Sequence, residues 1–236
     1  MPEFERFDSR HYRTVGVAEG YAAWHATYEA TVLDAMDLAL LARVESVDWA
    51  NLSDVADLGC GTGRTAAWLV AHGASGIDGV DITPEMLESA RGRGAHRSLR
   101  VADVGATDLP DSAYDLVICS LVDEHLKTLD RLYSEARRLL RPTGCFVVVG
   151  FHPYFVMAAG MPTHFEDDGG GPVAIETYIH LPSEHFGAGR TVGLTALEFH
   201  EGVIDDTWVA AKPTWERYTD WPISFVWVWA PERSHT

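Results

Sequence analysis

The sequence predicts an α/β protein built on a doubly wound, mostly parallel sheet. Apolar segments of strand length alternate with helical segments between residues 50 and 151, which is typical of a parallel sheet with helices on both faces. Glycine and acidic residues follow several of the strands, at the edge where ligands of such sheets bind. With 236 residues, 47% of them apolar, the chain is long enough for one such domain with additional segments.

Five strands and three helices are expected in this core. Residues 114–120 are apolar on both faces, which indicates a central parallel strand. Thr83 and Pro84 are suited to the N-cap and the first position of a helix. The strands are expected at 53–58, 75–80, 98–102, 114–120 and 145–151, and the helices at 65–72, 83–91 and 128–140.

The pattern is less regular outside the core. Residues 21–47 contain no Pro or Gly and are predicted to be helical. Residues 152–182 are rich in Pro and Gly and are interpreted as an insertion that cannot build a core of its own. A short helix (183–194) and two strands (197–203 and 223–230) are expected after it. We therefore predict a single domain over 1–236, made of an N-terminal arm and helix (1–48), a core (50–151), an insertion (152–182) and closing strands (183–236).

Composition excludes several classes of function. The formal net charge of −17 disfavours nucleic acid as a partner, since such proteins gather Lys and Arg against phosphates. The sequence contains no run of 18 apolar residues, so no transmembrane helix is expected. Residues 1–10 lack the apolar core of a signal peptide. Cys60, Cys119 and Cys145 match no zinc-binding spacing. The expectation is a cytoplasmic protein with reduced thiols and no membrane partner.

The most informative stretch runs from Asp57 to Arg64, with glycines at 59, 61 and 63. Glycine adopts positive φ without strain and has no side chain, so backbone N–H groups of such a turn can approach a ligand closely. The dinucleotide fingerprint G-x-G-x-x-G would need a glycine where Arg64 stands, which disfavours a nicotinamide oxidoreductase. An acidic residue at Asp57 suits a cofactor with an ammonium and a sulfonium group better than a pyrophosphate.

The spacing D-x-G-x-G-x-G resembles motif I of the class I S-adenosylmethionine-dependent methyltransferases. Gly79-Val80-Asp81-Ile82-Thr83-Pro84-Glu85-Met86-Leu87 matches the same family, as does Asp103 after the third strand. The resemblance covers residues 50–151 and is greatest to the bacterial small-molecule enzymes of the ubiquinone/menaquinone and biotin-pathway type. It implies a seven-stranded Rossmann-like sheet with an N-terminal helical segment, an insertion after strand five and an antiparallel last strand.

The resemblance also implies S-adenosyl-L-methionine as cofactor and assigns residues to it. Asp81 would bind both ribose hydroxyls, a task for which a carboxylate is suited. Asp103 and the N–H of Val104 would meet the adenine, and an N-terminal helix carrying Tyr21 would close over the cofactor. The expected binding set is Tyr21, Asp57, Gly59, Cys60, Gly61, Gly63, Asp81, Ile82, Met86, Asp103, Val104, Ser120 and Leu121.

Methyl transfer needs the acceptor in line with the sulfonium–methyl bond, and it needs a base only when the acceptor holds a proton. His125 and His152 follow strands four and five and are the candidate catalytic residues. The acidic clusters 123–125 and 166–168 are alternative candidates for a metal site, but no second ligand set follows strand five, so no metal is expected. Phe165 and Trp208 are candidates for the wall of a substrate pocket.

The predicted function is methyl transfer from S-adenosylmethionine to O, N or C of a small organic metabolite, aromatic or apolar in character. The run Cys119-Ser120-Leu121-Val122 differs from the Asn/Asp-Pro-Pro-aromatic run of DNA and glutamine methyltransferases. The alternative is an S-adenosylmethionine-binding protein of the same fold with a non-methylating role, either cyclisation or scaffolding. A monomer and a homodimer are both compatible with the sequence.

Overall fold

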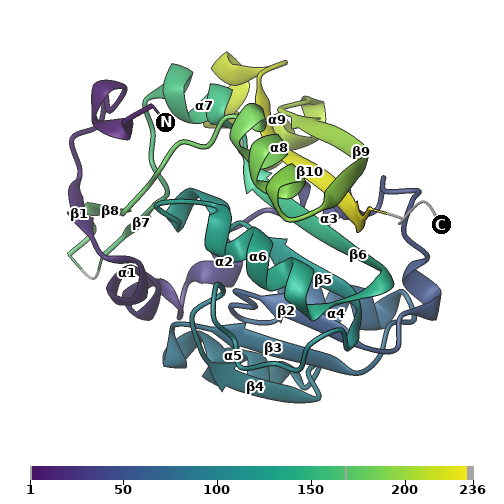
Figure 1. Cartoon of the computed structure of the whole chain (residues 1–236). Coiled ribbons are helices and arrows are strands. Elements are labelled where there is room, and N and C mark those ends of the chain that lie inside the picture. Colours follow the sequence, from purple (N-terminus) through teal and green to yellow (C-terminus); the bar gives the residue numbers. More distant parts are fainter. Residues whose placement is uncertain (1, 168, 233–236) are drawn as a thin grey trace.

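The computed structural model describes residues 2–167 and 169–232 and is dominated by one twisted seven-stranded sheet (Figure 1). Neighbouring strands from β4 to β6 are parallel, whereas β10 is antiparallel to both β6 and β9. In their order across the sheet, the strands are β4 (Ser98–Val101), β3 (Ile77–Asp81), β2 (Val55–Leu58), β5 (Tyr114–Ser120), β6 (Leu140–Phe151), β10 (Pro222–Pro231) and β9 (Leu194–Val203). The predicted fold class and the antiparallel last strand are confirmed.

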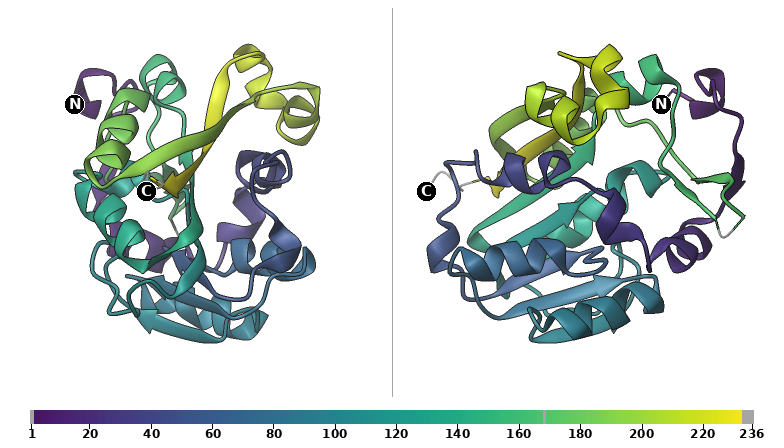
Figure 2. Two further views of the ribbon diagram at one scale, coloured as in Figure 1. Left: turned by 45° about the vertical axis from the view of Figure 1, so that its right-hand side comes forward. Right: turned by 180° about the vertical axis from the view of Figure 1, so that it is seen from behind.

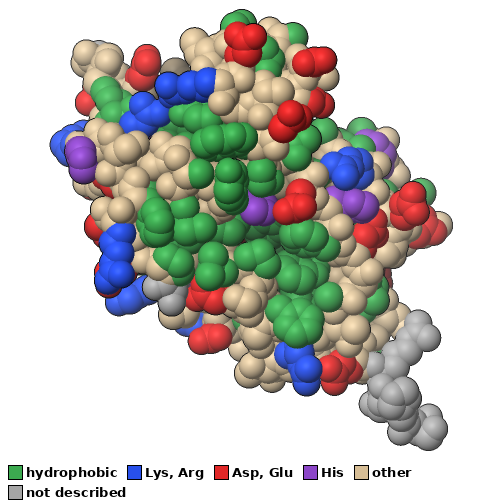
Figure 3. Space-filling view, turned by 90° about the horizontal axis from the view of Figure 1, so that it is seen from above, with side chains coloured by type: hydrophobic (Ala, Val, Ile, Leu, Met, Phe, Trp, Pro, Cys, Tyr) green, Lys and Arg blue, Asp and Glu red, His purple; other side chains and the backbone are tan. Residues whose placement is uncertain are grey.

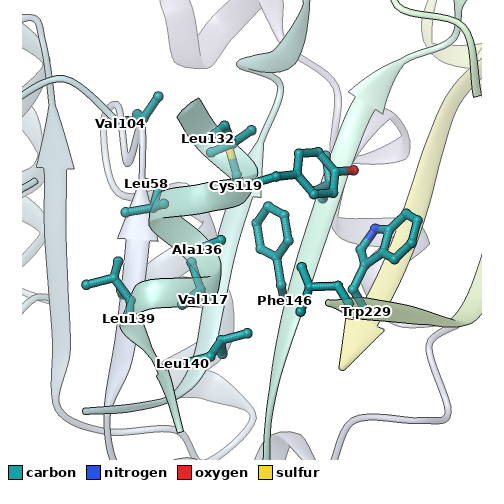
Figure 4. Close-up of a cluster of buried hydrophobic side chains, with 14 of the residues drawn as sticks. Leu58, Val104, Val117, Cys119, Leu132, Ala136, Leu139, Leu140, Phe146 and Trp229 are labelled. Atoms are coloured by element: carbon teal, nitrogen blue, oxygen red, sulfur yellow. The ribbon is translucent and has the colours of Figure 1, made fainter. Parts of the chain in front are cut away.

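Helices cover both faces of the sheet (Figures 1 and 2). On one face, α6 (Asp130–Leu139) and α8 (Pro182–Thr191) pack on the strands, and Figure 4 shows Leu132, Ala136 and Leu139 of α6 among the side chains of β5 and β6. On the other face, α3 (Leu38–Leu41) and α4 (Arg64–Ala71) bury a second cluster. α5 (Pro84–Arg93) links β3 to β4. The sheet is therefore buried on both sides, which is why its central strands are apolar throughout.

The predicted helix over residues 21–47 is wrong, because the segment folds into four short pieces. These are α1 (Val17–Trp24), α2 (Tyr28–Thr31), a 3₁₀ turn (Asp34–Met36) and α3. The hydroxyl of Thr31 donates to the Thr27 and Tyr28 carbonyls, and Val32 is extended (φ −94°, ψ 120°). Asp37 accepts a hydrogen bond from the backbone N–H of Leu38 and starts α3. Local polar bonds thus break the helix without Pro or Gly.

The N-terminal arm contains a strand that pairs with the insertion. Its strand β1 (Arg13–Val15) pairs in parallel with β8 (Pro172–Ile175) of the insertion, and β8 pairs with β7 (His164–Glu166). Val15, Trp24, Phe165 and Ile175 are buried together between these segments. The insertion, which cannot form a core alone, therefore forms one with the arm.

The core boundaries differ from the expected ones mainly in β6. This strand begins at Leu140, five residues before the expected start at Cys145, and runs through Pro142 and Gly144. The remaining elements are η1 (Phe4–Arg6), η3 (Trp49–Asn51), η4 (Asp123–His125), α7 (Pro153–Ala159), α9 (Asp206–Ala211) and η5 (Pro213–Tyr218). Among the described residues, no helix is both long and apolar enough to cross a bilayer.

Hydrophobic side chains gather in the middle of the face that Figure 3 shows from above, where α7, α8, α9 and β9 lie in Figure 1. Tyr154, Phe186, Leu197 and Phe199 are exposed on these elements by 38–51% of their surface. This apolar face does not belong to either of the cavities described below.

Candidate active site

A cavity of about 340 Å³ lies at the carboxyl ends of four parallel strands. The loops after β2, β3, β4 and β5 form its walls, and the N-terminal segment adds Val17 and Tyr21 from α1 and Tyr28 from α2. We call it the glycine-loop cavity. The predicted residues that line it are Tyr21, Gly59, Gly61, Asp81, Ile82, Met86, Asp103, Val104, Ser120, Leu121 and His125.

The glycine loop connects β2 to α4 and has three glycines at positive φ: 72° at Gly59, 50° at Gly61 and 82° at Gly63. A Cβ at Gly59 would lie 2.4 Å from Cγ2 of Val122, whereas one at Gly61 would meet nothing within 4 Å. Gly59 is therefore required by packing, and Gly61 leaves open space on the side of the cavity that it lines.

Asp81 ends β3 and holds this loop. Its Oδ2 accepts from the backbone N–H of Gly61 at 2.8 Å, and its Oδ1 accepts from the N–H of Thr83 at 2.8 Å. Burial raises the pKa of this carboxyl, while the two N–H donors oppose the rise. Each carboxylate oxygen keeps a second lone pair, so Asp81 can still accept hydroxyl donors of a ligand.

One buried hydroxyl at the cavity, Ser120 Oγ, has no hydrogen-bond partner among the described residues, whereas the Thr83 hydroxyl bonds to Asp81. Asp103 accepts from the N–H of Gly105 at 2.7 Å and pairs with Arg131 at 3.4 Å, with its side chain half exposed. Buried hydroxyls are normally satisfied in folded proteins. Ser120 therefore offers this cavity a polar group that a ligand can satisfy.

Three residues predicted to bind the cofactor do not line the cavity: Asp57, Cys60 and Gly63. Successive side chains of a strand point to opposite faces, and the side chain of Asp57 is buried against His96, with Oδ2 and Nε2 3.2 Å apart. Burial raises the pKa of the Cys60 thiol. Gly63 is the N-cap of α4 and packs on His96 and α5. These residues shape the loop from beneath.

His125 lines the cavity, but both of its ring nitrogens are occupied. Nδ1 is 2.7 Å from the carbonyl oxygen of Glu176, which can only accept, so Nδ1 carries the proton. Nε2 is 2.8 Å from the hydroxyl of Tyr21. With both ring nitrogens hydrogen-bonded within the protein, the imidazole orients Tyr21 and offers no free nitrogen to a substrate.

A second cavity of about 850 Å³ adjoins the first, and Tyr21, Tyr28 and Leu121 line both. We call it the aromatic cavity. Phe165 and Trp208, expected at a substrate pocket, both line it. The aromatic side chains in its wall are Tyr12, Tyr21, Trp24, Tyr28, Phe151, Phe165, Trp208 and Trp215.

Glu124 also lines the aromatic cavity, although its side chain is only 6% exposed. Its Oε1 accepts a long hydrogen bond of 3.5 Å from the Thr163 hydroxyl and lies 3.8 Å from Nε2 of His125, and its side chain also shares a hydrogen bond with that of Asp123. Burial raises the pKa of this carboxyl to about 7; His125 opposes the shift and Asp123 adds to it. The sequence placed Glu124 only within a candidate metal cluster, and nothing in its spacing distinguished it from Asp123.

Comparison with known proteins agrees with this geometry. A model of the methyltransferase domain matches residues 56–148. Trans-aconitate 2-methyltransferase of Escherichia coli O1:K1 / APEC is 30% identical over 183 residues, which covers 73% of this chain and 70% of that protein. The chain belongs to the S-adenosylmethionine-dependent methyltransferase family. The predicted family is confirmed.

The chain is also similar to a second relative in sequence and to a solved structure in fold. Malonyl-[acyl-carrier protein] O-methyltransferase of Geobacter sulfurreducens is 36% identical over 135 residues, 55% of this chain and 49% of that protein. The chain thus spans about half the length of this curated relative. An S-adenosylmethionine-dependent methyltransferase structure from Mesorhizobium loti has a TM-score of 0.66 at 24% identity, covering 83% of this chain and 97% of that one.

His152, the second predicted catalytic residue, lies outside both cavities of this methyltransferase-family chain. Its Nε2 is 3.0 Å from Oε1 of Glu201 on β9, and its Nδ1 accepts from the N–H of Tyr154 as the N-cap of α7. Burial lowers the pKa of the imidazole despite the neighbouring Glu201. The geometry gives His152 a structural role in turning the chain from β6 into α7.

The two clusters weighed as metal sites do not converge in the methyltransferase fold. Asp123 faces His185 (3.3 Å), Glu124 lines the aromatic cavity and His125 faces Tyr21. Within residues 2–167 and 169–232, no group of three or more His, Cys, Asp and Glu side chains could hold a metal ion. Asp168 of the second cluster lies outside the described residues.

Proposed function

We propose that this chain transfers a methyl group from S-adenosyl-L-methionine to a small organic metabolite with an aromatic or apolar body. The observation that carries the proposal is the meeting of two cavities at Tyr21, Tyr28 and Leu121. One has polar groups at the ends of four strands, and the other is walled by aromatic rings. A reaction between a polar cofactor and an apolar substrate requires such a junction.

The residues of the glycine-loop cavity fit the cofactor. Asp81 would accept from the ribose hydroxyls while Gly61 holds its carboxylate in place. Ile82 and Met86 offer apolar surface and Asp103 an acceptor for the adenine end. Ser120, whose buried hydroxyl has no partner among the described residues, would bind the methionine end. We infer that Asp57, Cys60 and Gly63 act only by shaping the loop.

The bound cofactor would supply an electrophilic methyl group on a sulfonium. The contribution of this chain is then to align the acceptor with that group and to exclude water, which can supply much of the acceleration. Tyr21, held by His125, and Leu121 stand where the two ligands would meet. These residues would fix the approach of the acceptor from the aromatic cavity.

A turnover assay tests the proposal. The purified protein is incubated with S-adenosylmethionine carrying a labelled methyl group and with a panel of aromatic and apolar metabolites. We expect label in a small-molecule product, with S-adenosylhomocysteine released in equal amount. Tight cofactor binding without any transferred label would contradict methyl transfer and favour a non-methylating role.

A further inference from the structure

The carboxyl of Glu124 lies buried in the wall of the aromatic cavity beside a second buried acid. Its side chain shares a hydrogen bond with that of Asp123, and its Oε1 accepts the long 3.5 Å hydrogen bond from Thr163 and lies 3.8 Å from Nε2 of His125. Buried negative charge is costly unless it is paired or fully hydrogen-bonded. A cation or a strong donor that enters the cavity would offset this cost.

Aromatic rings surround the same position. Tyr21 stacks on Trp24, whose ring also stacks on Phe165, and Tyr28 meets Trp24 edge to face. Burial raises the pKa values of Tyr21 and Tyr28, and the charge of the nearby Glu124 adds to the rise in both. Ring faces attract cations, and rings beside a carboxylate form a well-attested site for an ammonium group.

The charged side chains of the aromatic cavity favour a cation as well. Three of them are carboxylates, Glu124, Glu166 and Asp167, against one lysine, Lys212. The Nζ of Lys212 already lies over the ring of Trp215, 4.2 Å from its centre. An anionic acceptor placed beside Glu124 would meet a like charge in a medium of low dielectric constant, which is unfavourable.

We propose that the methyl acceptor is an amine on an aromatic or apolar body, and that Glu124 binds it as an ammonium and takes up the proton it loses. This inference rests on the proposed function, which it narrows to N-methylation. It also moves the role of base from His125, whose nitrogens are both occupied, to Glu124.

The proton and electron balance of this step is complete. One N–H proton of the ammonium passes to Glu124, and the freed nitrogen lone pair bonds to the methyl carbon. The carbon–sulfur bond breaks with its electron pair staying on sulfur, and Glu124 later loses its proton to solvent. A carboxylate with a pKa of about 7 can serve an ammonium, whose pKa is near 10, far better than an aliphatic alcohol, which is much less acidic.

Titration calorimetry with three probes of one shape tests the inference. The probes are 2-phenylethylamine, 2-phenylethanol and 3-phenylpropionate, each titrated into protein saturated with S-adenosylhomocysteine. We expect the amine to bind about tenfold to a hundredfold more tightly than the other two, as charge-assisted hydrogen bonds predict. Glu124→Gln should remove this preference and leave the binding of S-adenosylhomocysteine unchanged. Glu88→Gln, an equal change of charge at an exposed residue of α5 outside both cavities, should retain it.

The wild-type ranking needs no variant, so it decides the matter even if Glu124→Gln fails to fold. Amine binding that is absent at millimolar concentration, or no tighter than that of the propionate, would overturn the inference. An amine preference that survives intact in Glu124→Gln would overturn the role of Glu124. A folded protein that binds no S-adenosylhomocysteine would instead contradict the proposed function itself, so the two failures are distinguishable.

Discussion

Gly59 and Gly61 lie two residues apart in one loop, but Gly59 is needed for packing and Gly61 for ligand space. Gly59 packs on Val122, whereas Gly61 leaves open space on the side of the cavity that it lines. Gly59→Ala should lower the free energy of unfolding by about 3 kcal/mol, from overpacking and a left-handed backbone together. Gly61→Ala should cost only about 1 kcal/mol but weaken S-adenosylhomocysteine binding, because its methyl group would stand in the ligand's path. Urea unfolding and calorimetry on both variants separate the two effects; equal stability losses would contradict the assignment.

The titration of Glu124 predicts that the rate of methyl transfer depends on pH. Its carboxyl has a pKa of about 7 because it is buried; His125 opposes this shift and Asp123 adds to it. Tyr21 and Tyr28 lie beside the carboxyl. Only the ionised form can take a proton, so the rate of methyl transfer should rise with pH and show an inflection near pH 7. Rate profiles at saturating cofactor check this. In Glu124→Gln the inflection should disappear, and a wild-type profile with no change of slope near pH 7 would contradict the prediction.

Residue roles could be predicted from sequence only where a strand end fixes the position. Asp81, Asp103 and Ser120 follow strands and reach the cavity, as the parallel sheet requires. Asp57 lies within its strand, so the face that its side chain takes depends on the packing of His96 from the loop before β4. That contact between distant residues has no signature in the local sequence.

At the scale of elements, ion pairs anchor the N-terminal segment over the glycine loop. Arg64 begins α4 and reaches Asp34 and Asp37, each at 2.9 Å. Glu29 of α2 pairs with Arg93 of α5 at 2.9 Å and accepts from the hydroxyl of Thr62 in the loop. Arg64, which stands where a dinucleotide fingerprint has glycine, thus has a structural reason to be there.

Removing this anchor should be costly. The Asp37 side chain is only 5% exposed, and its pKa is raised to about 6 by burial, against the opposing effect of Arg64. Arg64→Gln would leave this carboxylate unpaired and lower the free energy of unfolding by about 3 kcal/mol. Asp37 would then titrate at a still higher pH, so the loss should be larger at about pH 8 than at about pH 5, where the carboxyl is neutral.

Urea unfolding of Arg64→Gln at the two pH values measures this effect, and the exposed Arg91→Gln on α5 is the matched control. The control should change the free energy of unfolding by less than about 0.5 kcal/mol. A loss in Arg64→Gln no larger than that of the control, or one that grows at low pH, would contradict the anchor.

An element can be predicted from sequence when neighbouring residues determine it, and not when contacts between distant residues do. β5 was predicted with its observed bounds because it is mostly apolar, and five of its seven residues are buried. The segment 21–47 was not, because Thr31 and Asp37 bond to the backbone in place of the helix and tertiary ion pairs hold the pieces. The composition of this segment favours helix, and the segment does contain short helices. It does not form the single long helix that was predicted.

At the scale of the whole molecule, the aromatic cavity is assembled from both ends of the chain. Trp24 and Tyr28 come from the N-terminal segment, Phe165 from the insertion and Trp208 from α9. β1 and β8 join two of these parts across about 160 residues of sequence, Arg13 opposite Val173. Pairings between such distant segments leave no periodic pattern, so the sequence indicated single pocket residues but not the cavity.

The central claim is that the glycine-loop cavity binds S-adenosylmethionine through Asp81, and calorimetric titration with S-adenosylhomocysteine tests it most directly. We expect saturable binding to the wild-type protein, none for NAD, and about tenfold to a hundredfold weaker binding in Asp81→Asn. Glu88→Gln, which removes one charge from an exposed site on α5, should bind as the wild type does. Folded wild-type protein that fails to bind S-adenosylhomocysteine, or an Asp81→Asn variant that binds it unchanged, would contradict the account.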